Sequence, residues 1–347
     1  MTTQHGLIIE KPGAPFKVVD SLERPTPGSK QALVKSLFVA INPVEEYMSK
    51  TGAITTEMPA VLGSDFCGLV VQDGPGCNKL QTGDYVFGLC RLGRNQFSPF
   101  QETFLVDEDL VFRKDGRIEP EAAAGVGLGV LTSALGIVVG GKKPLPHHGM
   151  KIAEHDEWIV VLGGSGTVGH YAVQIARLCG YKVAASCSPR KSESVLQRGA
   201  NATFNNRSPV TDQAAEIKAI TDGHFSLIFD TSALCHGVAR EAFKHSTAAE
   251  KYFSTTDTVT EFQTGSDVNE YRVITSLLGR EDVRSRHVTA EVAKMVPLLE
   301  AHIADGTITP VEYELHAGVG WEILAKAIAQ YEAGKVEKKL VVRVQEG

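Results

Sequence analysis

Short apolar runs separated by turn residues dominate the first third of the chain. The runs lie at Gly6–Ile9, Ala32–Ile41, Cys67–Val71, Tyr85–Leu89 and Thr103–Val106. Gly, Pro and Asp residues separate them, as in Pro25–Gly28 and Gln81–Asp84. This pattern predicts an all-β lobe over residues 1 to about 120. From Pro120 the pattern changes, and the Ala-, Gly-, Val- and Leu-rich segment Glu121–Gly140 predicts packed helices.

Strand and helix patterns alternate after Glu157. Strands are predicted at 158–162, 181–186, 201–204, 225–230, 250–254 and 273–278, with helical patterns between most of them. Such alternation is typical of an α/β fold with a doubly wound parallel sheet. A helix at about 288–304 follows, then a strand (311–315), a helix (320–333) and a strand (338–344). The closing strands are expected to rejoin the first lobe, because an isolated strand pair has little stability.

A glycine-rich turn joins the first of these later strands to its helix. The apolar run Trp158–Leu162 leads into G-x-G-x-x-G at Gly164, Gly166 and Gly169, and an apolar helical pattern follows at once. The glycines permit a tight turn and close approach of a pyrophosphate, while the helix N-terminus presents free N–H groups. A lone motif is often only a tight turn. Because both flanks fit, the motif predicts a dinucleotide site.

The next strand indicates which dinucleotide is bound. An NAD site would carry Asp or Glu near Ser186 to hold the ribose 2′-hydroxyl, but no carboxylate occurs between Gly169 and Glu193. Hydroxyls and two cations stand there instead, at Ser186, Ser188, Arg190 and Lys191. Arg and Lys form charge-assisted hydrogen bonds to phosphate oxygens, so this set favours NADPH. The alternative interpretation is an ordinary polar loop with solvated charges.

Composition and charge narrow the classes of protein and partner. A chain of 347 residues with 43% hydrophobic content favours two packed domains. The net charge of −6, without a basic patch, argues against nucleic acid or anionic membrane as partners. Neither a transmembrane run nor a signal peptide is predicted. Six cysteines without C-x-x-C spacing argue against a disulfide framework and a four-cysteine zinc lobe, and suit the cytoplasm.

The order of these parts resembles the medium-chain dehydrogenase/reductase superfamily. Local matches support the resemblance, at Ile41–Tyr47, Leu62–Gly68, Gly83–Phe87, the glycine turn and Gly334–Val342. It implies a GroES-like β domain made of 1–125 and 305–347, and a Rossmann domain made of 126–304. Nicotinamide and substrate are expected in the cleft between them, because pockets favour domain interfaces.

The zinc-dependent alcohol dehydrogenases of this superfamily carry Cys at or near Asn42, and Gly-His-Glu where this chain has Gly63-Ser64-Asp65. Ser64 cannot replace a His ligand, and 39–51 contains no cysteine. A catalytic zinc needs about three protein ligands, so no metal is expected. The adjacent His147 and His148 lie beside two prolines and are interpreted as a solvated loop.

Two zinc-free groups resemble the chain. Gly125–Thr132, Gly199-Ala200 and the closing Gly-Lys-Val look like the fungal trans-acting enoyl reductases, which work beside polyketide synthases or hybrid synthases. The zeta-crystallin-like quinone oxidoreductases are similar at Asn42–Tyr47 and Gly63–Asp65. Many enoyl reductase partners carry Trp-Lys where this chain has Glu46-Tyr47.

The enoyl reductase resemblance also implies cofactor contacts. Asn206 stands where Tyr is usual, and Val336 and Glu337 fall where the family contacts the nicotinamide end. The whole expected cofactor set is Gly164, Ser165, Gly166, Thr167, Val168, Gly169, Ser186, Ser188, Pro189, Arg190, Lys191, Asn206, Val336 and Glu337.

The activity expected from this resemblance is NADPH-dependent reduction of the carbon–carbon double bond of an enoyl thioester. A quinone oxidoreductase is the alternative, and a non-catalytic cofactor-binding scaffold is the third possibility. Tyr47 could donate to a developing enolate or supply its proton, Asn42 could orient nicotinamide or substrate, and Lys50 is a substitute donor. Thr132 could bond a carbonyl or the nicotinamide amide. The simpler interpretations are that Tyr47 packs against the lobe and that Thr132 bonds its own i−4 carbonyl.

Overall fold

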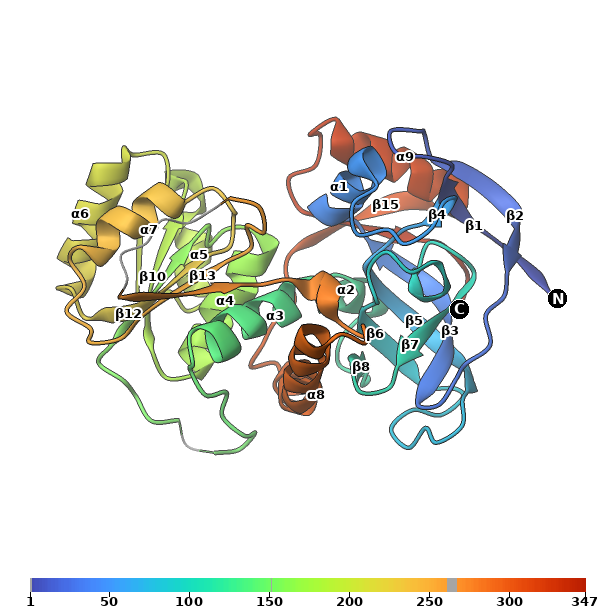
Figure 1. Ribbon diagram of the computed structural model, residues 1–347, viewed down its shortest axis with the longest axis horizontal. Coiled ribbons are helices and arrows are strands. Elements are labelled where there is room, and N and C mark those ends of the chain that lie inside the picture. The colour runs from blue at the N-terminus through green and yellow to red at the C-terminus, as the bar shows by residue number, and fades with distance from the viewer. Residues whose placement is uncertain (1, 151, 261–266) are drawn as a thin grey trace. The chain divides into compact units, whose positions relative to one another are not determined.

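The computed structural model describes residues 2–150, 152–260 and 267–347 (Figure 1). The chain forms two compact units. Met1–Leu128 and Thr275–Gly347 make up the first unit, and Gly129–Ile274 make up the second. A β-rich unit and a parallel sheet covered by helices confirm the predicted α/β class.

The first unit is built on two sheets that join the two ends of the chain. A three-stranded sheet has the order β2-β1-β4, and a seven-stranded sheet has the order β15-β16-β3-β5-β6-β8, with β7 paired to β3. β16 pairs antiparallel to β3, with Val341 opposite Ala40, so the prediction that the closing strands rejoin the first lobe is confirmed. The strands are β1 (Thr3–Ile9), β2 (Lys17–Glu23), β3 (Gln31–Ala40), β4 (Ala60–Val61), β5 (Asp65–Asp73), β6 (Tyr85–Leu89), β7 (Thr103–Asp107), β8 (Val111–Arg113), β15 (Tyr313–Val319) and β16 (Lys339–Arg343).

Two helices of the first unit pack on a shared apolar core. Met48 of α1 and Leu324 of α9 lie in one cluster with Leu7, Val39 and Val342 of the strands. Burying Met48 fixes which face of α1 turns outward, and Tyr47 and Lys50 lie on the exposed face. The helices are α1 (Pro43–Thr51), η1 (Asn95–Phe97), α2 (Pro120–Ala124), η4 (Thr275–Leu277), α8 (Val283–Ala304) and α9 (Trp321–Glu332).

The second unit is a six-stranded sheet with the order β11-β10-β9-β12-β13-β14, and every pairing in it is parallel. The order reverses between β9 and β12, and ligands of doubly wound sheets bind beyond the carboxyl ends of the strands at such a point. The strands are β9 (Trp158–Leu162), β10 (Lys182–Cys187), β11 (Ala202–Asn205), β12 (Phe225–Asp230), β13 (Lys251–Thr255) and β14 (Val268–Arg272). The helices are α3 (Gly127–Ala134), η2 (Leu135–Gly140), α4 (Thr167–Leu178), η3 (Pro189–Lys191), α5 (Ser192–Gln197), α6 (Val210–Thr221) and α7 (His236–Phe243).

Two sequence predictions differ from the structure at the end of this unit. The strand predicted at 273–278 is wrong, because the last strand is β14 and η4 follows it. β14 is a partly exposed edge strand. It contains Asn, Glu and Arg, so it has no apolar run by which a strand could be predicted. The helix predicted at 288–304 is part of α8, which belongs to the first unit rather than to a domain 126–304. Glu300 of α8 accepts the backbone N–H of Arg113 at 2.7 Å and thereby ties this helix to β8.

Candidate active site

The glycine turn between β9 and α4 is hydrogen-bonded to the neighbouring strand β10 and has open space beside Gly166. The Gly163 N–H donates to the Ser186 hydroxyl at 2.8 Å, and the Gly164 N–H donates to the Ser186 carbonyl at 2.8 Å. A Cβ on Gly169 would lie 2.1 Å from the Gly163 carbonyl oxygen, so only glycine lets α4 approach the strand. A Cβ on Gly166 would meet only that oxygen, at 3.6 Å. The Gly166 side therefore leaves room for a ligand beside the free N–H groups of α4, as a pyrophosphate requires.

Two exposed cations follow the neighbouring strand. Ser188 leads into η3, which carries Pro189, Arg190 and Lys191. Both cations are exposed, and neither forms an ion pair within the described residues. Asn206 lies beside them, because its backbone N–H donates to the Cys187 carbonyl at 3.1 Å. The predicted cofactor residues of the second unit therefore share the carboxyl edge of one sheet. They fit a dinucleotide that carries an additional phosphate.

A buried polar network anchors α1 in the first unit. Both Nδ2 hydrogens of Asn42 are donated, to Ser64 Oγ and Asp65 Oδ2 at 2.9 Å each. Lys339 donates to Asp65 Oδ2 at 2.9 Å and to Asn42 Oδ1. Ser64 donates to Glu45, whose second oxygen accepts the Asn42 N–H at 2.7 Å. We call Asn42, Glu45, Ser64, Asp65 and Lys339 the Asn42 network, and all five are buried.

The charge of the Asn42 network depends on one proton. It holds two carboxylates and one ammonium group, so it carries a net negative charge when both acids are ionised. Burial raises the pKa of Glu45 to about 7, although the Ser64 hydrogen bond and Lys339 oppose that shift. The nearby Asp65 carboxylate raises it further. Protonating Glu45 makes the network neutral, which is the cheaper state for a buried cluster.

The predicted catalytic residues fall into three environments. Tyr47 is 47% exposed, and its hydroxyl has no hydrogen-bond partner among the described residues. Lys50 is also exposed and forms an ion pair with Glu46 on the same helix. Asn42 is buried at the start of that helix, within its network. Thr132 is buried on α3 in the second unit, whereas Val336 and Glu337 lie in the first unit between α9 and β16.

Comparison with known proteins places the chain in a family. Residues 28–116 match the alcohol dehydrogenase GroES-like domain. Over 253 residues the chain is 32% identical to the trans-enoyl reductase traG of Penicillium crustosum, covering 69% of this chain and 68% of that protein. The chain belongs to the trans-enoyl reductase family. This membership, within the medium-chain dehydrogenases/reductases, confirms the resemblance and the GroES-like and Rossmann architecture.

Other relatives extend the likeness over the whole chain. The trans-enoyl reductase grgB of a Penicillium species is 26% identical, over 99% of both chains. An alcohol dehydrogenase superfamily protein from Novosphingobium aromaticivorans shares the fold, with a TM-score of 0.78, 22% identity and coverage of 99% of this chain and 100% of that one. The chain spans about two thirds of the length of several curated relatives that it matches.

In the described part of this trans-enoyl reductase family member, no helix is both long and apolar enough to cross a membrane. Likewise, no three His, Cys, Asp or Glu side chains in residues 2–150, 152–260 and 267–347 are grouped to hold a metal ion.

The stability of this family member is expected to depend on pH through Glu45. Its pKa rises from 4.5 to about 7 on folding, so between these values the folded chain holds a proton that the unfolded chain has lost. The free energy of unfolding therefore falls as pH rises through this window. Glu45 also faces Lys339, Asp65, Cys90 and Tyr331. Chemical unfolding across the window measures the slope, and Glu45→Gln should flatten it. An identical slope in both proteins would contradict this prediction.

Sequence reasoning missed that Glu45, Asp65 and Lys339 come together in one buried polar network. Glu45 had a local signal, because it lies three residues after Asn42 at the spacing of a capping box. Lys339 had none, because it lies 274 positions from Asp65 in the sequence. The pairing of β16 with β3 brings them together.

Proposed function

We propose that this chain is an NADPH-dependent reductase of an activated carbon–carbon double bond in an enoyl thioester. The named activity of its trans-enoyl reductase relatives supports the reaction class. Arg190 and Lys191, which have no ion-pair partner in the part of the chain that the structure describes, follow the strand beside the glycine turn, and this observation carries the choice of NADPH. A cytoplasmic polyketide synthase or hybrid synthase is the proposed source of the substrate.

Different residues of the chain are proposed to take different roles in this reaction. When bound, the cofactor supplies a hydride to the β-carbon of the substrate. The protein must stabilise negative charge on the thioester oxygen and supply a proton to the α-carbon. Tyr47 is the proposed donor, because its hydroxyl has no hydrogen-bond partner among the described residues and the Asn42 network anchors its helix. Asn42 acts as a positioning residue, since both of its donor hydrogens are occupied. Thr132 is proposed to bond a carbonyl or the nicotinamide amide, and Val336 and Glu337 to contact the nicotinamide end.

Neutralising Arg190 and Lys191 should shift the cofactor preference. The double variant Arg190→Ala/Lys191→Ala is expected to weaken NADPH binding roughly 100-fold or more, because each of the two lost charge-assisted bonds contributes about 1.5–3 kcal/mol. NADH lacks the 2′-phosphate and should bind as before. Calorimetric titration with each cofactor measures both affinities. An equal loss for NADPH and NADH would show that the pair acts through folding or net charge.

The reaction itself is tested with the purified chain and a panel of acceptors. An enoyl thioester such as a crotonyl N-acetylcysteamine ester should consume NADPH and yield a product heavier by two hydrogens, measured by mass spectrometry. Quinones should be poor acceptors. Rapid quinone reduction without thioester reduction would favour the quinone oxidoreductase, whereas cofactor binding without turnover of either would favour a scaffold.

A further inference from the structure

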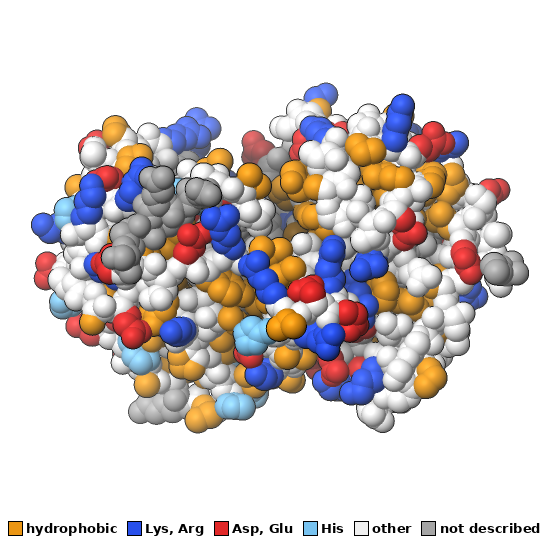
Figure 2. Space-filling model, in the orientation of Figure 1, with side chains coloured by type: hydrophobic (Ala, Val, Ile, Leu, Met, Phe, Trp, Pro, Cys, Tyr) orange, Lys and Arg blue, Asp and Glu red, His pale blue; other side chains and the backbone are white. Residues whose placement is uncertain are grey.

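A charged cavity of about 320 Å³ lies in the first unit, beside η4 and the start of α8. Figure 2 shows Lys and Arg side chains gathered on this part of the unit's surface. Four cations and three carboxylates line the cavity, namely Lys30, Arg91, Arg280, Arg286, Asp107, Asp109 and Glu281. The way these charges pair decides what the cavity can bind.

Each lining carboxylate is already engaged. Asp107 accepts two hydrogen bonds of 2.6 Å from the Arg91 guanidinium. Asp109 lies 3.9 Å from the Lys30 ammonium and also pairs with Lys79.

The third lining carboxylate, Glu281, and the neighbouring Asp282 follow Arg280 directly in the sequence, and both have other partners. Glu281 lies 3.9 Å from Arg286. Asp282 caps α8 by accepting the Ser285 N–H at 3.1 Å. Among the described residues, Arg280 is therefore a lining cation without an ion-pair partner.

A second arginine adds to this unbalanced charge. Burial and the neighbouring guanidinium of Arg94 lower the pKa of Arg280. The Arg94 side chain is exposed and has no ion-pair partner within the described residues either. The two guanidinium groups carry like charges that repel each other, and an anion between them would remove that cost. Arginine binds phosphate through paired N–H donors, so phosphate is the anion best matched to such a pair.

The arginine pair is connected to the helix that carries Tyr47. Arg280 Nη2 donates to the Ile54 carbonyl at 3.3 Å, in the loop that follows α1. The Thr56 N–H in the same loop donates to the Gly93 carbonyl at 3.0 Å, one residue before Arg94. A Cβ on Gly93 would lie 2.2 Å from the Ile54 carbonyl oxygen, so these segments pack closely. An anion held there would be bound beside the loop that continues from the proposed catalytic helix.

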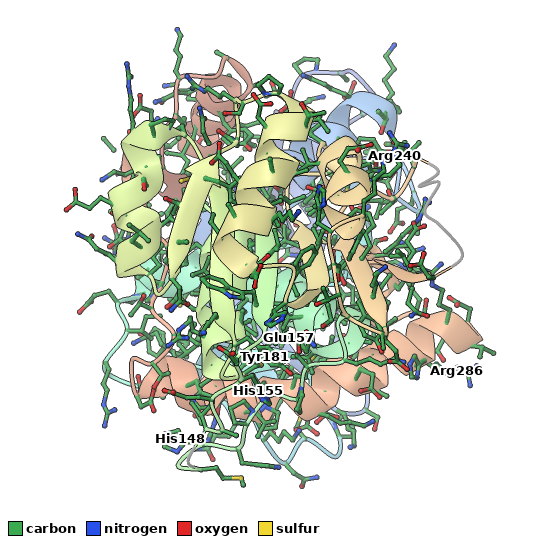
Figure 3. All side chains as sticks on the ribbon, turned by 90° about the vertical axis from the view of Figure 1, so that its left-hand side faces the viewer. His148, His155, Glu157, Tyr181, Arg240 and Arg286 are labelled. Carbon is green, nitrogen blue, oxygen red and sulfur yellow. The ribbon has the colours of Figure 1, made fainter. Side chains whose placement is uncertain are left out.

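A second cavity, in the second unit, lacks this charge imbalance. It measures about 530 Å³ and is lined by Lys143, Glu157 and Ser226 among others. The Lys143 ammonium is 3.2 Å from Glu157 and 2.7 Å from Ser226 Oγ, and it lies over the Tyr181 ring. Figure 3 shows Glu157 and Tyr181 close together at one end of the sheet. The buried cation there is already compensated.

We propose that Arg280 and Arg94 bind the phosphate of a phosphopantetheine arm that carries the enoyl group as its thioester. This inference rests on the proposed function. Coenzyme A and carrier proteins both present the acyl group on this arm, so the shared phosphate is the recognised chemistry. A truncated thioester without phosphate would then be a poorer substrate of the same enzyme.

Kinetics with two matched thioesters test the proposal. Crotonyl-pantetheine and crotonyl-phosphopantetheine differ only in the phosphate. Arg280→Ala should lower kcat/KM for the phosphorylated ester roughly 10- to 100-fold, mainly through KM, because it removes a charge-assisted contact. The unphosphorylated ester should lose far less. Arg280→Lys should retain part of the preference, and added salt should weaken it.

A matched control uses another arginine of the same cavity. Arg286, labelled in Figure 3, lies near the start of α8 and already has Glu281 beside it. Arg286→Ala should leave the preference for the phosphorylated ester unchanged. Equal losses on both esters in Arg280→Ala would overturn the proposal, as would no loss on either.

Three further outcomes separate the sources of phosphate and the proposed function. A similar loss with crotonyl-coenzyme A and with a crotonyl-loaded carrier protein supports recognition of the shared phosphate. A loss confined to the carrier protein overturns it in favour of a protein–protein contact. If the parent reduces no thioester, the proposed function fails. Calorimetric titration with phosphopantetheine then tests the phosphate site separately. If the parent binds phosphopantetheine and Arg280→Ala does not, the site is supported. If the parent does not bind it, the proposed site is overturned.

Discussion

Replacing Lys339 with methionine is expected to lower the free energy of unfolding of the first unit by about 3–5 kcal/mol. The ammonium group lies 2.9 Å from Asp65 Oδ2, and both side chains are almost completely buried. Removing it leaves the Asp65 charge without a cation in a site that water cannot reach. The loss of a cation also leaves Asn42 Oδ1 without the donor that Lys339 provides.

The two tryptophans allow this loss to be measured in one unit. Trp321 lies in α9 of the first unit, and Trp158 lies in β9 of the second. In a Trp158→Phe background, denaturant unfolding followed by tryptophan fluorescence reports on the first unit alone. Adding Asp65→Asn to Lys339→Met should recover much of the loss, because the double variant holds no uncompensated Asp65 charge. A single variant as stable as the parent would show that the buried pair contributes nothing.

The parts of the site that could be predicted from sequence are those formed by residues that are adjacent in the chain. The glycine turn follows one strand directly, and Ser188 to Lys191 follow the next strand. Because parallel strands end at the same edge of a sheet, local patterns were enough to bring these two segments together. β10 and β12, which pair with β9 on its two sides, were also predicted from sequence, because each contains a local run of apolar residues.

The features that sequence reasoning missed depend on contacts between distant segments. The helical pattern of α8 was recognised, but its place in the first unit follows from contacts such as Glu300 with Arg113. The Asn42 network needs β16 to return to β3 before Lys339 can meet Asp65. Arg94 and Arg280 likewise come from loops that have no relation in sequence. A single sequence shows the residue types but not which charges remain unpaired after folding.

Removing the hydroxyl of Tyr47 is expected to lower turnover of the enoyl thioester roughly 10²- to 10⁴-fold, the range for losing a general acid. Tyr47→Phe keeps the aromatic ring, so any packing of the ring on the first unit is retained. The hydroxyl has no partner in the described part of the chain, so its loss breaks no protein hydrogen bond there. Cofactor affinity should stay the same, because the predicted phosphate contacts lie in the second unit.

The matched control for this variant is the second candidate donor on the same helix. Lys50 forms an ion pair with Glu46, so its ammonium group is already engaged. Lys50→Met should therefore lower turnover much less than Tyr47→Phe, when kcat and NADPH affinity are measured side by side. Turnover close to the parent's in Tyr47→Phe would assign Tyr47 to packing. A large loss in Lys50→Met alone would make Lys50 the proton donor, whereas parent-like turnover in both would leave Thr132 or a bound water as the source of the proton.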